Sequence, residues 1–378
     1  MKGIFLAYGD RENYLSTGVG KKVSAQLDLF NSDGMSCKLE MLDCYNSLPI
    51  DKFFLRLPFT NKSPKWTYRP EFSQVDFIYL RRPEFMTGYM IDVLKRVKGS
   101  NPEIKILLEI PTFPYDTEVA HREDGLPFDL PLLWRDRYWR KKLGGCVDRI
   151  ILLNREIDDL WGIPVVHIRN GIDIKKVLPR KCASSDDKRI NLIGVAMFKE
   201  WHGYERVIEG LSEYALSKGA DKPDVHLYLV GEGPEVASYK KLVEENNLTE
   251  TVHFCGFKSG QELDRMYDNC HIGLASFGCY KKNLEEVQDL KSREYLAKGL
   301  PIVSGCNISE LDDSNQFYLQ FPNNDSAVDI DRVVQFYREL RKTKSQEDVT
   351  NEIRSFAART VSIEAGMDQV MSYLKGNE

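Results

Sequence analysis

The stretch EEVQDLKSREYLAKGLPIVSG, residues 285–305, decides the fold of this chain. Asp289 and Ser292 are both good N-caps, and the residues that follow favour a helix. Gly299 and the proline after it end that helix. The next residues, 301–303, are apolar and predict a buried parallel strand. The stretch therefore predicts a loop, a short helix and a strand in an α/β fold.

Two carboxylates flank the predicted start of this helix. Glu286 lies in the loop, and Glu294 lies eight residues further on, one turn into the helix. The unpaired amides at a helix N-terminus attract anions, and a diphosphate suits them. The stretch thus predicts a site for an anion with a hydroxylated group beside it. The alternative is that two glutamates on a solvated helix face have no function.

This pattern resembles the signature of the family 4 retaining glycosyltransferases, which have the GT-B architecture. The resemblance rests on Glu286, Glu294 and the following alanine-glycine-leucine-proline type of ending. It spans essentially the whole chain and is strongest over residues 190–305. It implies that Glu286 lies against the donor sugar and Glu294 holds the nucleotide ribose. It also implies that the amides around Leu290 and Lys291 approach the diphosphate.

Length and composition fit two α/β domains. The 378 residues, 42% hydrophobic, have room for two cores. A net charge of −5 argues against a dedicated nucleic-acid binder. The eight cysteines include no CxxC pair, so we expect reduced thiols without a disulfide framework or zinc site. The sequence has no apolar run near ~18 residues and no signal-peptide pattern at its start, which predicts a cytoplasmic protein.

Apolar runs predict parallel strands in both halves of the chain. The turn Asn170-Gly171-Ile172-Asp173 matches the turn that closes the N-terminal domain in the family that the chain resembles. We therefore expect an acceptor-side Rossmann-like domain over residues 1–173 and a nucleotide-sugar-binding one over residues 174–354, facing each other across a cleft. The amphipathic segment 353–374 resembles the terminal helix of that family. We expect this helix, about 355–378, to pack back on the first domain.

Glycines follow the first predicted strand. Gly18 and Gly20 precede a predicted helix and would let the backbone approach a ligand. They resemble the glycine loop that faces the donor diphosphate in the family. The pattern lacks the third glycine of a dinucleotide-binding fingerprint, and a plain tight turn is the alternative.

Several polar residues in the first half are candidates for the acceptor side. Arg81 follows a strand, at the edge where α/β sheets bind ligands. The stiff loop EIPTFPYDTE contributes Tyr115 and Asp116, and His121 follows it. His121 is a candidate proton handler, although a lone loop histidine is more often merely exposed.

The phosphate-binding loop of the second half departs from the family pattern. With Gly203 aligned, His202 stands at the usual lysine position and Met197 at the usual arginine position. Lys199 lies between them, and its flexible ammonium can reach the same phosphates. Phe257, after the predicted strand 252–257, is expected near the nucleotide base.

Residues 132–143, LLWRDRYWRKKL, combine aromatic and basic side chains. This composition suits an anionic membrane surface, where lipid-carried acceptors are found. The alternative is an ordinary surface helix whose aromatics face the core.

Together these features predict a retaining glycosyltransferase that moves a hexose from a UDP-sugar, or else a GDP-sugar, to a saccharide or lipid-linked hydroxyl. We expect no metal and no cofactor. The catalytic candidates are Glu286 and Lys199. Two alternatives remain: a GT-B sugar-nucleotide epimerase, and a non-catalytic sugar-nucleotide-binding partner of another transferase.

Overall fold

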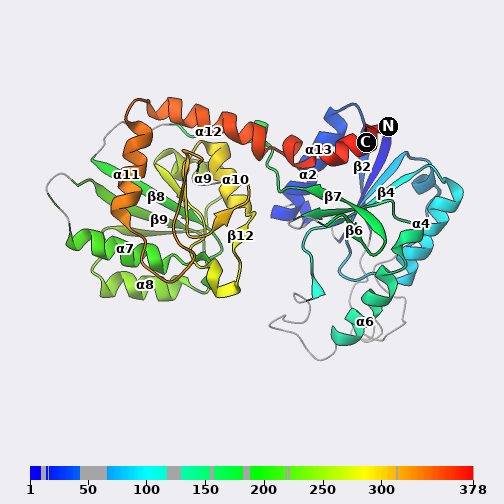
Figure 1. The fold of residues 1–378 in the computed structure, drawn as a ribbon, viewed down its shortest axis with the longest axis horizontal. Helices are drawn as coiled ribbons and strands as arrows, with labels where there is room; N and C mark the ends of the chain where they lie inside the picture. The colour runs from blue at the N-terminus through cyan, green and yellow to red at the C-terminus, as the bar shows by residue number, and fades with distance from the viewer. Residues whose placement is uncertain are drawn as a thin grey trace. The chain divides into compact units, whose positions relative to one another are not determined.

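The computed structural model describes residues 1–9, 14–15, 17–42, 66–116, 129–153, 157–181, 188–217, 219, 222–311 and 314–377. The chain forms two compact units, residues 1–169 with 366–378, and residues 170–365 (Figure 1). The boundary between the units therefore lies before the turn at residues 170–173, whereas the sequence predicts it after that turn.

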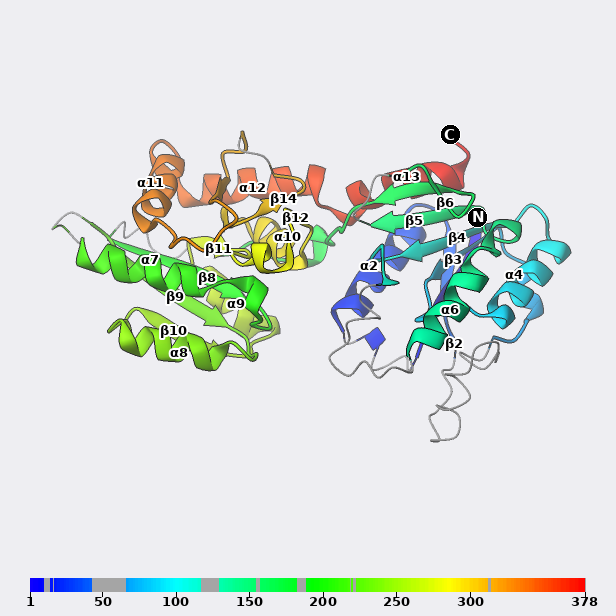
Figure 2. The ribbon, with the colours of Figure 1, turned by 60° about the horizontal axis from the view of Figure 1, so that its bottom comes forward.

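The first unit contains a sheet in the order β2-β1-β3-β4-β5-β7-β6. All neighbours pair in parallel except the short edge strand β6. The strands are β1 (Lys2–Tyr8), β2 (Ser36–Leu42), β3 (Phe77–Arg81), β4 (Lys105–Ile110), β5 (Arg149–Leu153), β6 (Asp159–Leu160) and β7 (Ile163–Ile168). The helices are α2 (Gly18–Ser32), α4 (Gly88–Ser100), α6 (Asp129–Arg140) and α13 (Ile363–Lys375), with 3-10 turns at Pro70–Ser73 and Leu143–Gly145. Helix α13 packs with this sheet (Figure 2), and the His167 amide of β7 donates to the Gln369 side chain of α13 at 3.2 Å.

The second unit contains an all-parallel sheet in the order β10-β9-β8-β11-β13-β15. Its strands are β8 (Arg189–Val195), β9 (Asp224–Val230), β10 (Val252–Gly256), β11 (Ile272–Leu274), β13 (Ile302–Ser304) and β15 (Tyr318–Gln320). A separate pair joins β12 (Glu286–Val287) to β14 (Asn307–Ile308). The helices are α7 (Glu205–Leu216), α8 (Val236–Glu245), α9 (Gly260–Asp268), α10 (Leu290–Lys298), α11 (Ile330–Arg341) and α12 (Gln346–Thr360). Short 3-10 turns are η3 (Ile174–Lys176), η4 (Glu200–His202) and η5 (Cys279–Lys282).

Helix α10 forms where the sequence predicts it. Of the two candidate caps, Asp289 is the N-cap, and its carboxylate accepts the Ser292 amide at 2.9 Å. Gly299 closes the helix with a φ of 81°, a conformation that favours glycine. Strand β13 follows directly and is buried along its whole length. The organising stretch therefore folds as a loop, helix and strand, as predicted.

The terminal amphipathic segment is not one helix. It forms α12 and α13, which are separated at residues 361–362. The Val361 carbonyl accepts the Ile172 amide at 2.9 Å, and the Ile172 carbonyl accepts the Ile363 amide at 3.0 Å. These bonds take the backbone away from helical pairing, and the Ser362 hydroxyl caps the new helix start through the Ala365 amide. Hydrophobic periodicity alone does not reveal such a break.

A buried carboxylate, Glu109, anchors α2 to the sheet of the first unit. Its side chain is fully buried, and it accepts hydrogen bonds from four side chains of this unit: Lys22 (3.4 Å), Gln26 (2.9 Å), Tyr79 (2.6 Å) and Arg81 (2.7 Å). Burial alone would raise the pKa of Glu109, but Lys22 and Arg81 outweigh it and hold that pKa at about 2. The ionised carboxylate therefore stabilises the folded state.

We expect the free energy of unfolding to fall, by on the order of 3 kcal/mol, as the pH drops from about 4.5 to about 2. A carboxyl whose pKa is lower in the folded state stabilises the fold above its unfolded pKa, and that stability disappears on protonation. Glu109→Gln should lack this step and unfold more easily at neutral pH. Denaturant unfolding over a pH series measures both effects. Glu40→Gln, at an exposed ion pair with Arg69, is the matched control, and an equal loss there would contradict the assignment.

Candidate functional site

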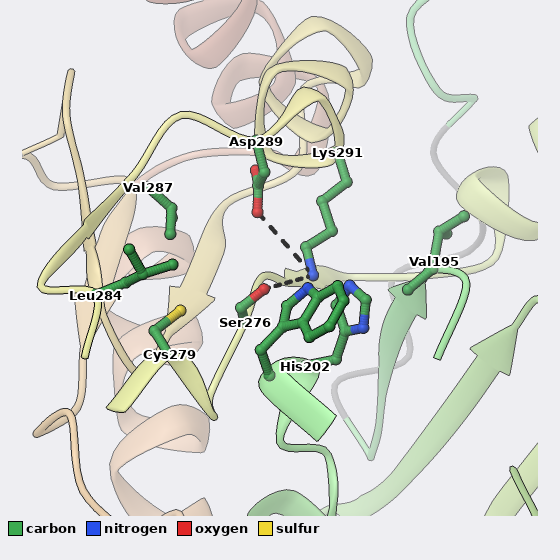
Figure 3. Close-up of a pocket in the computed structure, with 10 residues that line it drawn as sticks. Val195, His202, Ser276, Cys279, Leu284, Val287, Asp289 and Lys291 are labelled. Carbon is green, nitrogen blue, oxygen red and sulfur yellow. Dashed lines mark hydrogen bonds and ion pairs between the residues drawn. The ribbon is translucent and has the colours of Figure 1, made fainter. Parts of the chain in front are cut away.

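A pocket of about 340 Å³ lies at the carboxyl edge of the second unit's sheet, where parallel sheets bind ligands. Loops after β8 and β11 meet the start of α10 there (Figure 3). The lining residues are Val195, Ala196, Trp201, His202, Ser276, Cys279, Leu284, Val287, Asp289 and Lys291. Of the residues singled out from the sequence as binding residues, His202 and Lys291 line this pocket.

Lys291 places a buried positive charge in the pocket. Its side chain is 11% exposed, and its ammonium donates to the Ser276 hydroxyl at 2.9 Å. The nearest counter-charge, Asp289, lies 4.0 Å away (Figure 3). Burial is the main cause that lowers the pKa of Lys291, and Asp289 opposes it only in part. A buried ammonium with three N–H donors, at the first turn of a helix, suits an anionic ligand.

The two loops that carry His202 and Ser276 are joined by backbone hydrogen bonds. The Phe277 amide donates to the His202 carbonyl at 2.8 Å, and the Gly278 amide donates to the Trp201 carbonyl at 3.2 Å. Gly203 has a φ of 63°, and a Cβ there would lie 2.3 Å from the Gly278 nitrogen. Only glycine therefore allows this approach. The contact fixes both loops at the pocket wall.

His202 is a neutral hydrogen-bonding group in this pocket. Its Nδ1 accepts the Lys199 amide at 3.0 Å, so the proton of the neutral ring resides on Nε2. Burial, reinforced by the nearby positive charge of Lys291, lowers the pKa of His202 to about 3. His202 thus stands at the expected lysine position without supplying a positive charge.

We expect His202 to remain neutral, with the proton on Nε2, down to about pH 4, since its pKa is about 3. Long-range ¹H–¹⁵N spectra of the imidazole rings test this directly, and a His202→Gln variant assigns the signal. Between about pH 3 and 6.5 the unfolded chain binds the extra proton, so this group makes stability rise with pH. Titration of the native ring near pH 6.5 would contradict the assignment.

Two more lysines lie near the side chains of Trp201 and His202. The Lys282 Nζ lies 3.4 Å from the centroid of the Trp201 ring, and the Lys199 Nζ lies 4.9 Å from it. Both also act on the charge state of His202. Lys199 itself is outside the pocket lining, so its predicted phosphate contact stays a prediction. The two lysines nevertheless add positive charge to this corner of the unit.

The two motif glutamates lie apart from the pocket lining. Glu286, in β12, is exposed, and its carboxylate accepts a hydrogen bond from Ser309. Its position adjoins Val287, which does line the pocket. Glu294 is half-buried in α10, where its carboxylate acts with burial to raise the pKa of Tyr267. Their predicted sugar and ribose contacts remain untested.

The remaining donor-side candidates have different surroundings. Gly18 and Gly20 lie in the first turn of α2, and the Gly20 amide donates to the Thr17 cap. A Cβ at Gly20 would lie 2.1 Å from the Tyr14 carbonyl oxygen, so tight packing in the first unit accounts for this glycine. In the second unit, Phe257 is 73% exposed after β10 and Leu290 is 43% exposed.

The acceptor-side candidates take part in interactions within the first unit. Arg81 pairs with Glu109, and Asp116 pairs with Arg137 and Arg140 of α6 at 2.8 and 2.7 Å. Tyr115 is fully buried, and its hydroxyl donates to Asp136 at 2.7 Å. A direct acceptor contact by Tyr115 would therefore require it to leave this bond. His121 lies outside the described residues.

Sequence reasoning missed much of the pocket wall. Trp201, Ser276 and Cys279 were not singled out, and Asp289 was identified only as a helix cap. Ser276 follows β11 at the carboxyl edge of the sheet, a position that could have been noticed. Trp201 carries no such signal, because its role depends on the contact between two loops.

Among the described residues, no group of three or more His, Cys, Asp or Glu side chains could hold a metal ion. The predicted independence of metal stays a prediction. In the same part of the chain, no helix is both long and apolar enough to cross a membrane.

Comparisons with known proteins identify the fold, and part of the second unit matches a known family model. Residues 179–305 match the family model described as glycosyl transferases group 1. A search of curated proteins found no match. Similar solved structures include a glycosyltransferase from Rickettsia africae, with a TM-score of 0.61, 10% identity, and coverage of 99% of this chain and 98% of that chain. Sucrose-phosphate synthase from Thermosynechococcus elongatus (0.60, 14%) and HepE from Anabaena in complex with UDP (0.56, 13%) each match over 100% of both chains. The fold is GT-B, as predicted.

Proposed function

We propose that the protein is a retaining glycosyltransferase, because residues 179–305 match the family model of glycosyl transferases group 1 and the chain has the GT-B fold. It moves a hexose from a UDP-sugar to a hydroxyl of a saccharide or lipid-linked acceptor. The observation that carries this proposal is the buried ammonium of Lys291 in the pocket at the start of α10.

The pocket favours departure of a nucleoside diphosphate. Negative charge gathers on the diphosphate as the glycosidic bond breaks, so fixed positive groups stabilise the transition state more than the ground state. Lys291 and the backbone amides of Leu290 and Lys291 at the start of α10 supply such groups, and the neutral His202 donates from Nε2. Lys199 and Lys282 add positive charge at longer range. On this proposal, these groups stabilise the charge and a metal is not required.

Glu286 orients the donor sugar through a hydrogen bond to a hydroxyl, and Glu294 holds the ribose. The leaving phosphate oxygen takes the acceptor proton in an attack on the same face of the sugar. A dedicated protein base is then unnecessary. These roles follow the resemblance of the motif, and the exposure of the Glu286 carboxylate is compatible with a substrate contact.

UDP is favoured over GDP as the leaving group. HepE, of the same fold at 13% identity, is known in complex with UDP and with UDP-glucose. That likeness supports UDP at the level of the fold.

Turnover of nucleotide sugars in EDTA tests the proposal. The purified chain is incubated with a panel of UDP- and GDP-sugars, and release of UDP or GDP is followed, with Glu286→Ala as the inactive control. Slow hydrolysis of one UDP-sugar that Glu286→Ala abolishes would support the proposal. Tight binding without release from any donor, even with added saccharide acceptors, would instead favour a non-catalytic partner. No binding of any nucleotide would contradict the assigned site.

A lipid-carried acceptor would bring the first unit to a membrane surface. On α6, Trp134 is 68% exposed and Tyr138 is 48% exposed, one turn apart, whereas Trp139 packs against the core. The basic pair Lys141 and Lys142 follows directly. We propose that this face contacts anionic lipid. Sedimentation with phosphatidylglycerol vesicles tests it: Trp134→Ala should weaken binding, and equal binding to neutral vesicles would contradict it.

A further inference from the structure

Two buried cysteines meet beside the pocket. Cys279, at the start of η5, and Cys306, after β13, have their sulfurs 2.8 Å apart. Their side chains are 1% and 0% exposed, and Cys279 is one of the pocket-lining residues (Figure 3). The two sulfurs lie within hydrogen-bonding distance, and a disulfide requires them to approach to ~2.05 Å.

The surroundings favour reaction of this pair. The two thiols share a hydrogen bond, and this bond lowers the pKa of Cys306. The same hydrogen bond, together with burial, raises the pKa of Cys279. The positive charge of Lys291 acts in the opposite direction on Cys279 and favours its thiolate. The pair can thus ionise once while it shares the remaining proton.

We propose that Cys279 and Cys306 form a reversible redox modification site, at which hydrogen peroxide that enters through the donor pocket generates a disulfide. The disulfide would close a covalent loop around residues 280–305. That loop contains Glu286, Lys291 and Glu294, so the modification encircles the whole motif that the proposed function uses. The site itself rests on the geometry of the two thiols and does not depend on that function.

The reaction balances with one molecule of peroxide. The proton of Cys279 passes to Cys306 across the 2.8 Å contact, and the Cys279 thiolate attacks a peroxide oxygen. The O–O bond breaks, the departing hydroxide takes a proton from solvent, and Cys279 becomes a sulfenic acid. Cys306 then attacks the Cys279 sulfur, the S–O bond breaks, and hydroxide leaves with the Cys306 proton as water. Two thiols and one peroxide thus give one disulfide and two waters, counting the proton exchanged with solvent.

A bound nucleotide would affect this reaction by changing the access of peroxide to Cys279. Cys306 is fully buried, whereas Cys279 borders the pocket that also contains Lys291. A diphosphate on Lys291 would fill the approach to Cys279 and offset the positive charge that favours its thiolate. We therefore expect UDP to slow oxidation at least threefold, an expectation that rests on the proposed function.

Peptide mapping by mass spectrometry tests the proposal on the full chain. The protein is treated with a small excess of hydrogen peroxide, with and without saturating UDP, quenched with an alkylating agent and digested without reductant. We expect a linked Cys279–Cys306 peptide pair that disappears after dithiothreitol. Cys306→Ser and Cys279→Ser should each abolish it, whereas Cys255→Ser, a half-buried cysteine away from the pocket, should leave it unchanged.

The outcomes separate this proposal from the proposed function. If peroxide oxidises Cys255 in the wild-type protein while Cys279 and Cys306 are recovered as alkylated thiols, the proposed modification site is refuted. A linked pair that forms at the same rate with bound UDP would overturn access through the pocket. A linked pair in a protein that calorimetry shows not to bind UDP would uphold the site and refute the nucleotide assignment.

Discussion

Lys291→Met should lower kcat for donor turnover by about 100- to 1,000-fold, which corresponds to about 2.7–4 kcal/mol of lost transition-state stabilisation. The ammonium lies in the pocket with 11% of its side chain exposed, so water screens its charge little. UDP binding should weaken as well, because the charge also acts on the bound product. Steady-state kinetics and calorimetry with UDP measure the two effects.

The same substitution should not destabilise the protein. Burial lowers the pKa of Lys291, which means that the folded state bears a cost for its charge. Methionine removes that cost, so the melting temperature should stay equal or rise while activity falls. Lys282→Met is the matched control, because this exposed lysine lies over Trp201 at the same pocket. Equal losses in the two variants would refute a specific role for Lys291.

Glu286→Ala should lower kcat on the order of 100-fold while leaving the affinity for UDP unchanged. A hydrogen bond to a charged group contributes about 1.5–3 kcal/mol, and this one is made to the sugar, which UDP lacks. Glu286→Gln should lower kcat less than Glu286→Ala does, because the amide retains a hydrogen-bonding oxygen. Donor turnover and UDP calorimetry, measured on the same preparations, separate this pattern from that of Lys291→Met.

Two variants check that the Glu286 carboxylate itself is responsible. Glu285→Ala removes the preceding exposed glutamate and should keep full activity. Ser309→Ala removes the hydroxyl that donates to Glu286. It should lower kcat about tenfold, because the Glu286 carboxylate is then less well oriented. If Glu285→Ala were as harmful as Glu286→Ala, the assigned role would belong to the local backbone instead.

Local sequence signals were sufficient for the secondary structure around the site. Asp289 caps α10, Gly299 ends it, and β13 follows, because each depends on contacts within a few residues. Apolar stretches in the sequence likewise predicted strands in both units. The single terminal helix was a wrong expectation, since the break between α12 and α13 depends on a bond to the distant Ile172.

The composition of the pocket depended on the tertiary structure. His202 could be aligned with a lysine by sequence, but only its burial beside Lys291 makes it neutral. Cys279 and Cys306 are 27 positions apart, and no spacing rule pairs them. Tyr115 is a polar loop residue by sequence, yet the fold buries it against Asp136.

The sequence by itself therefore determined the α/β class, the GT-B resemblance and the helix start that offers an anion site, because hydrophobic period, caps and motif spacing are local properties. Only the tertiary structure decided which charges are desolvated, which loops meet and which thiols touch. Those properties arise from contacts between residues far apart in the chain, as in the backbone bonds that join the His202 and Ser276 loops. Burial then sets the protonation states on which the chemistry depends.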